Sequence, residues 1–471
     1  MTSRQTLRSV AIAAVCIVLP LASFGQVGES LPPNSPFRGG VPQGMATADS
    51  LSLSIAEVIK RALDHNLGVL LAEEGANGAT GARTVALSAL LPHVNGSVSG
   101  ARRKTNLEAF GFPLRAEFPR IVGPFSVFDA RVFLSQTVLD MSELNEFRAA
   151  EHSLAATRHS YRSARDLVVL VAANAYLQVL ATGARAETAR AQLETATTLH
   201  QQAISLRAGG LVAGIDVVRA EVRLSTERQR VTASTNDFEK AKLQLARLIG
   251  LPVGQSFTLS QEIPFVPIPE MTLEEALTRA YRERPDYLAA LERVQAAEAS
   301  RKAIQGEALP SLRLTADYGA IGLHWSDALP TFNVLGEVKV PIFEGGRVQG
   351  RLAQADAELK TRRAEADDAR SEVYYDVRMA FLDLKATEEV LQTAMRAREL
   401  ADLQLTQSRD RFAAGVTSNI EVVESQEAVA QASEQYIAAM YGFNVAKAML
   451  ARSLGTAEEA VAKYLGGPLI K

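Results

Sequence analysis

The chain has 471 residues, of which 47% are hydrophobic and 22% charged, and its formal net charge is −3. This length suits two or three ordinary domains, and the nearly balanced charge argues against nucleic-acid binding. Aromatic residues make up only 6%. The abundance of Ala, Leu, Glu, Gln and Arg is typical of long helices rather than of an enzyme core.

The N-terminus has the pattern of a secretory signal peptide. Arg4 and Arg8 precede an apolar run from Val10 to Leu21, and small residues follow up to Gly25. This pattern predicts export and cleavage after Gly25, since about 12 apolar residues are too few to span a bilayer. The sole cysteine, Cys16, lies inside the run and not at the cleavage point. A membrane anchor and lipidation at Cys16 remain as alternatives, and otherwise the mature chain has no cysteine.

Residues 26–50 are rich in proline and glycine and predict an extended or disordered lead-in. A helical pattern with a break near Asn66 follows over residues 53–90. From Pro92 the apolar period changes to two, which is the period of a β-strand.

Four runs alternate in this way, two in each half of the chain. The first two are separated by a predicted loop that includes Pro124. The alternating part of each run has seven to nine residues, and with its flanking residues each run is about ten residues long, which is enough for a tilted membrane strand. Apolar residues on one face and charges on the other suit lipid outside and water inside; half-buried strands of a soluble sheet are the alternative. The runs are 94–100, 128–135, 312–318 and 332–340.

Two very long helical hairpins are predicted. Residues 344–455 contain no proline, and Val373, Val377, Ala380 and Leu384 form one apolar stripe at helical spacing. A helix from about Gly346 to about Phe412 would be roughly 100 Å long. The same pattern occurs earlier in the chain, so each half ends in a hairpin.

The two halves are predicted to be copies of one ancestral unit. Gly210 matches Gly415 at a spacing of 205, and Glu57 matches Glu275 at a spacing of 218. Such recurrence in order indicates an internal repeat. The predicted organisation is a signal peptide (1–25), an extended segment (26–50), a first repeat of helix, two strands and hairpin (51–250), a Pro-rich linker (251–270), a second repeat (271–455) and a C-terminal tail (456–471).

Four membrane strands cannot close a barrel alone, because unpaired backbone groups are costly in hydrocarbon and bacterial barrels start at about eight strands. Several chains must therefore share one barrel. Their helical rods would pack side by side as coiled-coil pairs and form a hollow cylinder that continues the pore.

The chain resembles the TolC-like outer-membrane efflux proteins (outer membrane factors). The resemblance rests on the duplicated element order, on Val-Pro-Ile-Phe-Glu-Gly-Gly at 340–346, and on the hairpin tips at 207–210 and 411–415. It implies a homotrimer in the outer membrane of a Gram-negative bacterium. The fold would be mainly α, with a trimeric α-barrel tunnel in the periplasm joined to a 12-stranded β-barrel that contacts outer-membrane lipid, four strands per chain.

The implied function is the exit duct of a tripartite efflux system, which passively conducts substrates delivered by a periplasmic adaptor and an inner-membrane pump. The conduit of a type I protein secretion system is the main alternative. A soluble periplasmic scaffold or adaptor is a third reading, which leaves the alternating strands unexplained.

The resemblance places a ring of acidic side chains just past the tip of the second hairpin, at Glu421 and Glu424. Their first-half equivalents are Asp216 and Arg219, and Arg219 is expected to form an inter-helix salt bridge with Asp216 or Glu424. Clustered carboxylates in a constriction would attract cations. The alternatives are a helix-capping role for Glu421 and a solvated helix face for Glu424.

The hairpin tips are the predicted contact with the adaptor, and ordinary turn chemistry applies there in any case. Gly415 is expected to take a positive φ as a helix C-cap, and Ser418 with Glu421 has capping-box spacing. The tip residues are Gly209, Gly210, Leu211, Gly415, Val416, Thr417 and Ser418.

The sequence offers no catalytic or metal-binding motif. The six histidines show no metal-ligand spacing, and there is no phosphate loop, His-Glu-x-x-His or Gly-x-Ser-x-Gly motif. We therefore expect neither enzymatic activity nor a cofactor, a metal or a nucleic-acid partner.

Overall fold

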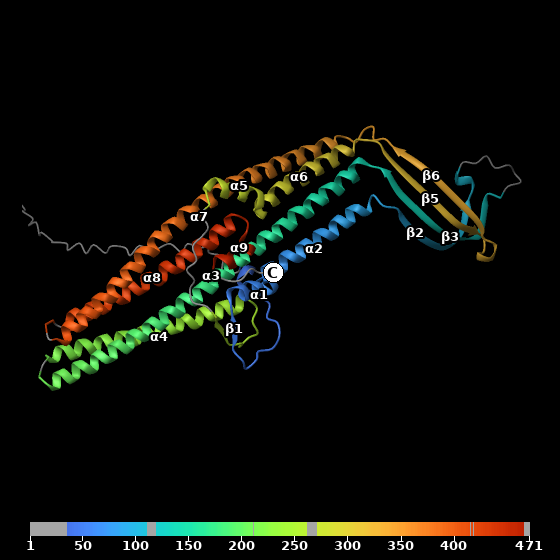
Figure 1. Cartoon of the computed structure of the whole chain (residues 1–471). Helices are drawn as coiled ribbons and strands as arrows, with labels where there is room; N and C mark the ends of the chain where they lie inside the picture. Colours follow the sequence, from blue (N-terminus) through green and yellow to red (C-terminus); the bar gives the residue numbers. More distant parts are fainter. Residues whose placement is uncertain are drawn as a thin grey trace, which may run out of the picture.

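The computed structural model describes residues 35–110, 119–210, 212–260, 271–414, 416–417 and 419–465. The predicted signal peptide and Cys16 lie outside this part. A four-stranded sheet lies at one end of the elongated molecule, and the tips of two helical hairpins lie at the opposite end (Figure 1).

From β1 onward, the elements of the first half of the chain recur in the second half in the same order, and the second half adds α9. The first half contains η1 (Pro36–Arg38), β1 (Leu51–Leu53), α1 (Ile55–His65), α2 (Leu67–Ser88), β2 (His93–Asn106), η2 (Glu108–Phe110), β3 (Ile121–Leu139), α3 (Met141–Ala208) and α4 (Gly214–Leu248). The second contains β4 (Phe257–Leu259), α5 (Leu273–Glu283), α6 (Pro285–Gly306), β5 (Ser311–Gly322), η3 (Trp325–Asp327), β6 (Leu329–Lys339), α7 (Arg347–Ala413), α8 (Asn419–Ser453) and α9 (Ala457–Tyr464).

Equivalent capping boxes begin the first helix of each half. The Ser54 hydroxyl accepts a hydrogen bond from the Glu57 amide, and the Glu57 carboxylate accepts one from the Ser54 amide. Thr272 and Glu275 make the same pair of bonds at the start of α5. Because these bonds satisfy otherwise unpaired amides at a helix start, they explain why the acidic residue recurs.

The predicted long helices are confirmed. α3 has 68 residues and α7 has 67, and each is followed by a 35-residue partner that runs back beside it. Val373, Val377 and Ala380 of the apolar stripe are buried, as are Val168 and Val179 in the first half. The stripe therefore holds each long helix against the rest of the chain.

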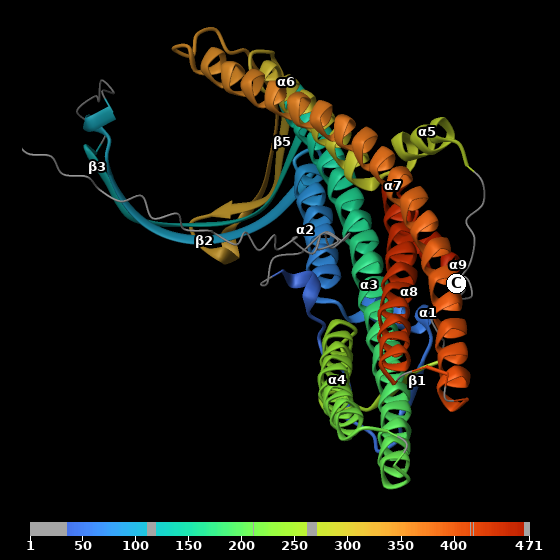
Figure 2. The same cartoon turned by 90° about the vertical axis from the view of Figure 1, so that its left-hand side faces the viewer.

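Figure 2 shows α3 and α8 side by side, with α4 and α7 on the outer sides. α3 contains a stretch long and apolar enough to cross a membrane by length and composition, but just over half of that stretch is buried in the chain. Its apolar residues, from Val168 to Val179, belong to the main core with α1, α4, α8 and α9. Packing in this core accounts for the composition of α3.

The N-terminal lead-in is tied to this core. The Gly40 amide donates to the Arg247 carbonyl oxygen and the Val41 amide to the His65 carbonyl oxygen, both at 2.8 Å. A Cβ at Gly40 would lie 2.6 Å from the Gly250 nitrogen, so only glycine allows this approach. Further along, β1 pairs in parallel with β4, which lies within the predicted Pro-rich linker.

The C-terminal tail contains a helix, α9, that was not predicted from the sequence. α9 buries Ala457, Val461 and Leu465 in the main core. Its start is held by Glu458, which forms an ion pair with Arg165 of α3 at 2.5 Å. Its end is held by the buried Lys447 of α8, which donates to the Tyr464 carbonyl oxygen at 2.8 Å. The helix therefore joins the long helices of the two halves.

The sheet has the order β2-β3-β5-β6, and all its pairs are antiparallel. The central pair, β3 with β5, joins the two halves of the chain. The prediction of a loop through Pro124 is wrong, because β3 already begins at Ile121. The longer strand continues pairing with β2 as far as Asn106. β2 and β6 have no strand partner on their outer sides within the described residues.

The predicted segregation of faces is confirmed. Strand alternation places Val98, Val132, Tyr318 and Phe332 on one face, and all are more than half exposed. The opposite face carries an ion-pair cluster, in which Arg131 contacts Asp129 at 2.6 Å and Asp317 at 3.0 Å. A single chain thus exposes a continuous apolar face on one side of its sheet, with no chain element among the described residues to cover it.

Candidate functional site

The second hairpin turns through a Schellman-type helix end. The Val416 amide donates to the Arg411 carbonyl oxygen at 3.0 Å, which is the six-to-one bond of that motif. This bond satisfies a carbonyl at the end of α7 and places Val416 at the tip, where 67% of it is exposed. Two of the other predicted tip residues, Gly415 and Ser418, lie outside the described residues.

Glu421 is held at this tip by two partners. Its carboxylate accepts a hydrogen bond from the Thr417 hydroxyl and pairs with Arg411 at 2.9 Å. The predicted capping box through Ser418 lies outside the described residues. Glu421 therefore links the end of α7 to the start of α8, and its side chain remains about one-third exposed.

The first hairpin has an equivalent turn. Gly209 caps α3, and the Gly210 amide donates to the Arg207 carbonyl oxygen at 3.0 Å. Gly210 has a φ of +72°, a left-handed conformation that favours glycine. The third predicted residue of this tip, Leu211, lies outside the described part of the chain.

Of the remaining predicted gate residues, Arg219 pairs with Asp216 as one of the two expectations had it, but within one helix. Arg219 contacts Asp216 at 3.4 Å, but both lie on α4 one turn apart, so this salt bridge does not join two helices. Glu424 is exposed and forms no ion pair with another described residue. It therefore remains available to face a pore or a partner.

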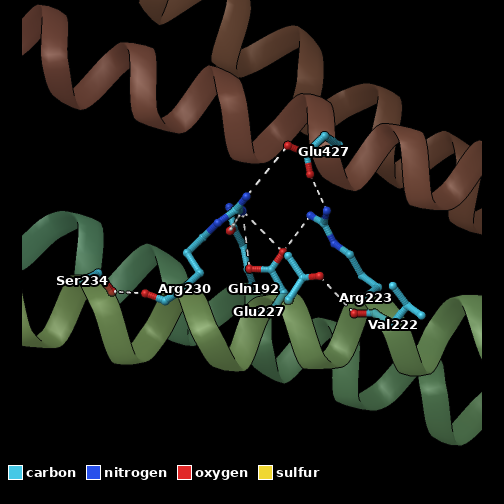
Figure 3. A network of polar contacts seen from close by, with 8 residues as sticks. Gln192, Val222, Arg223, Glu227, Arg230, Ser234 and Glu427 are labelled. Carbon is cyan, nitrogen blue, oxygen red and sulfur yellow. Dashed lines mark hydrogen bonds and ion pairs between the residues drawn. The ribbon is translucent and has the colours of Figure 1, made fainter.

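A charged cluster joins the two hairpins about two to four turns from the tips. Glu227 of α4 has a side chain only 1% exposed and contacts Arg223 at 2.8 Å and Arg230 at 3.4 Å. Both arginines also form ion pairs with Glu427 of α8, and the distance from Arg230 to Glu427 is 3.8 Å. Figure 3 shows these side chains meeting between the hairpins, with Gln192 of α3 accepting from Arg230 at 3.0 Å. We call these five residues the hairpin cluster.

The charges of the hairpin cluster balance, with two arginines for two glutamates. The hydrogen bond from Arg223 holds the pKa of Glu427 below its usual value, against the opposing effect of burial. Because removal of one partner of a buried pair leaves an uncompensated charge, the cluster resists separation of α4 from α8.

Sequence reasoning missed the hairpin cluster. The spacing of Arg223, Glu227 and Arg230 on one helix face is visible in the sequence. Their partner Glu427 is 200 residues away from Glu227, and no local pattern connects the two.

The family model for outer membrane efflux proteins matches residues 58–251 and 276–456, which together are well over half of the chain. The chain belongs to the outer membrane efflux protein family. Both matched segments of this efflux protein contain a strand pair and a long hairpin.

Several curated relatives cover most of the efflux protein at low identity. Outer membrane protein TolC of Escherichia coli (strain K12) is 24% identical over 73% of this chain and 72% of its own. Pyoverdine export outer membrane protein OpmQ of Pseudomonas aeruginosa is 26% identical over 61% of each chain. Alkaline protease secretion protein AprF of the same species is 21% identical over 69% of each chain.

The fold also matches solved outer-membrane channels. The CmeC outer membrane channel of Campylobacter jejuni superposes with a TM-score of 0.73 at 17% identity, covering 93% of this chain and 96% of that one. The predictions of a TolC-like, mainly helical fold with a β portion, and of an efflux protein in a Gram-negative outer membrane, are therefore confirmed.

Proposed function

We propose that three copies of this efflux protein form the passive exit duct of a tripartite efflux system, without catalytic chemistry of their own. The observation that carries this proposal is the exposed apolar face of a four-stranded sheet with two unpaired edges. β5 and β6 have 12 and 11 residues, which matches a tilted strand crossing a hydrocarbon layer about 25 Å tall.

The two unpaired edges support a head-to-tail assembly. β6 of one copy can pair with β2 of the next, and such a heterologous contact closes a ring when the rotation fits. Closure would leave no open edge in lipid, where unpaired backbone groups are costly. Three chains of four strands each give the barrel that the resemblance implies.

The helices support the same assembly. α7 carries a second apolar stripe, opposite the buried one, with Tyr375, Met379 and Leu382 exposed by 62, 54 and 63%. Their spacing of four and three residues is that of a coiled-coil seam. In the described part of this chain nothing covers the stripe, and a neighbouring copy is the partner that continues the ring.

We assign the hairpin tips to adaptor contact and the adjacent acidic residues to the periplasmic end of the pore. Val416 and Ile420 expose apolar surface at the second tip. Glu421 and Glu424 lie on α8 within one and a half turns after Ile420. Three copies would place six carboxylates around the entrance and favour cations there.

The relative AprF supports one alternative, a conduit for secreted polypeptides. The tunnel serves either cargo, because the pump and adaptor select what enters. Deletion of the gene, followed by screens for drug and metal sensitivity and for lost polypeptide secretion, distinguishes the two. Sensitivity to small toxic compounds with normal polypeptide secretion is the expected result.

The channel itself is tested with purified protein in planar bilayers. Stepwise conductance and a heat-modifiable oligomer of three chains are expected from outer-membrane fractions. A monomer without conductance would refute the duct. A variant that lacks Val416 and Thr417 tests the tips: it should conduct normally in bilayers but lose pump-dependent export.

A further inference from the structure

The β2–β3 hairpin extends beyond the rest of the sheet and carries three consecutive cations. Phe128 of β3 pairs with Gly100 of β2 on one side and with Gly322, the last residue of β5, on the other. β2 and β3 continue pairing to Asn106 and Ile121. Arg102, Arg103 and Lys104 lie on this extension, at the end of the sheet farthest from the helices (Figure 1).

These three side chains, which we call the basic triplet, have no ion-pair partner among the residues that the structure describes. All three are exposed. Three like charges in sequence repel each other, and an anionic partner outside the chain would relieve this repulsion. Among the described residues of this hairpin turn, Glu108 is the one acidic side chain, and it pairs with none of them.

The basic triplet continues the apolar face of the sheet. Strand alternation puts Arg102 on the same face as Val94 and Val98, which are 64 and 74% exposed. At the same end of the sheet, Trp325 and Phe332 are exposed by 80 and 75%. Aromatic residues at the end of an apolar belt are typical of a membrane–water boundary. Just beyond it lie the charged lipid headgroups.

We propose that the basic triplet binds the phosphate groups of a phosphorylated glycolipid in the outer leaflet of the membrane. This inference rests on the proposed function in one respect, the placement of the apolar face in lipid. A guanidinium group binds phosphate through two parallel hydrogen bonds, and cations close to an anionic lipid surface each add to the affinity. Three copies would form a basic collar around the distal end of the barrel.

The test compares Arg102→Gln/Arg103→Gln/Lys104→Gln with a charge-matched control, Lys360→Gln/Arg362→Gln/Arg363→Gln on α7. Each purified oligomer is titrated in non-ionic detergent with an acylated glucosamine disaccharide that carries two phosphates. Each cation near an anionic lipid surface contributes about fivefold, and Arg103 lies on the opposite face of the strand from Arg102, so the triplet variant should bind about twenty-fivefold more weakly. The control should bind as wild type, and Arg102→Gln alone should show a partial loss.

Three outcomes would overturn the proposal: unchanged binding by the triplet variant, equal binding of the same disaccharide without phosphates, or equal binding of inorganic phosphate alone. Conductance in bilayers of neutral lipid is measured in parallel. The triplet variant should keep wild-type conductance, which shows that it has folded. Absence of conductance in the wild-type protein would instead refute the proposed duct and leave the glycolipid titration as a separate result.

Discussion

Asp166 of α3 is a buried carboxyl group beside the start of α9. Burial raises its pKa to about 6, although its oxygen accepts a hydrogen bond from the Glu458 amide at 3.4 Å. A raised pKa in the folded state means that the carboxyl stabilises the fold at low pH and that this contribution is lost as the pH rises through 6.

Asp166→Asn should therefore stabilise the protein at pH 8 and have little effect near pH 4. Asparagine keeps the carbonyl oxygen that accepts from Glu458 but never becomes charged. A shift of about two pKa units corresponds to about 3 kcal/mol at most in the free energy of unfolding. Thermal unfolding at both pH values measures the difference, with the exposed Asp237→Asn as control. An equal gain at both pH values would contradict this account.

Glu421 and Glu424 are proposed to set the charge of the pore entrance. Glu421→Ala/Glu424→Ala should lower the preference for cations over anions and weaken block by multivalent cations, because six carboxylates are lost per trimer. Single-channel reversal potentials in a salt gradient measure this. Glu388→Ala/Glu389→Ala on α7 removes the same charge away from the tip and should leave the potential unchanged. Identical selectivity in the two double variants would discard the assignment.

At the scale of elements, the hairpin cluster determines how firmly one hairpin is held against the other. Glu427 of α8 shares two arginines of α4 with the buried Glu227. Loss of Glu427 leaves Arg223 and Arg230 with one carboxylate between them. Since the contact between α4 and α8 near the tips depends on these side chains, the hairpins should separate more easily.

Glu427→Ala should therefore widen the distance distribution between the two hairpin tips. Spin labels on cysteines at Ala208 and Ala414 report this distance by pulsed electron resonance. Labelling is selective, since the only natural cysteine precedes the predicted cleavage site. Glu239→Ala serves as the control, because Glu239 pairs with Lys242 on its own helix. A distribution identical to that of the control would show that the cluster does not hold the hairpins.

At the scale of the whole molecule, the surfaces of the single chain call for partners. Its described residues leave two sheet edges unpaired and two apolar surfaces uncovered, one on the sheet and one on α7. Lipid is the proposed partner of the surface on the sheet, because the strands that form this surface are long enough to cross a membrane. A second copy suits the second surface, because its spacing is that of a helix seam.

Leu382→Asp should reduce assembly by placing a charge in that seam. Gln392→Asp adds the same charge to α7, on an exposed position away from the stripe. The measurement is the fraction of heat-modifiable oligomer after mild detergent extraction, with chemical cross-linking of intact cells as a second readout. The oligomer should decrease for Leu382→Asp and remain for Gln392→Asp. Equal amounts in both variants would place the contact between copies elsewhere.

Much of the fold could be predicted from local patterns. The apolar stripe from Val373 to Ala380 predicted α7 almost to the residue. Alternation predicted the four strands and the faces of the sheet. The tips were found through Gly210 and its counterpart 205 residues later. These features depend on contacts within a few residues along the chain, so helical and strand periods record them directly.

The candidate site was predicted only in part. Glu421 was identified but its partner Arg411 was not. The pair of Arg219 with Asp216 was one of the two that were expected, but it lies within a single helix and does not join two helices. The hairpin cluster went unnoticed, because Arg223 and Glu427 meet only after two hairpins pack together. The role of α9 was missed for the same reason, since its short sequence gains stability from α3 and α8.

By itself, then, the sequence determined the lengths of the helices, the pattern of the strands and the duplication, since each follows from local periodicity and capping. The tertiary structure alone decided that β3 pairs with β5, that α9 joins the two halves, and that Arg223 and Glu427, 204 residues apart, neutralise each other between α4 and α8. Such pairings depend on which surfaces meet when distant segments pack, and spacing along the chain carries no record of that choice.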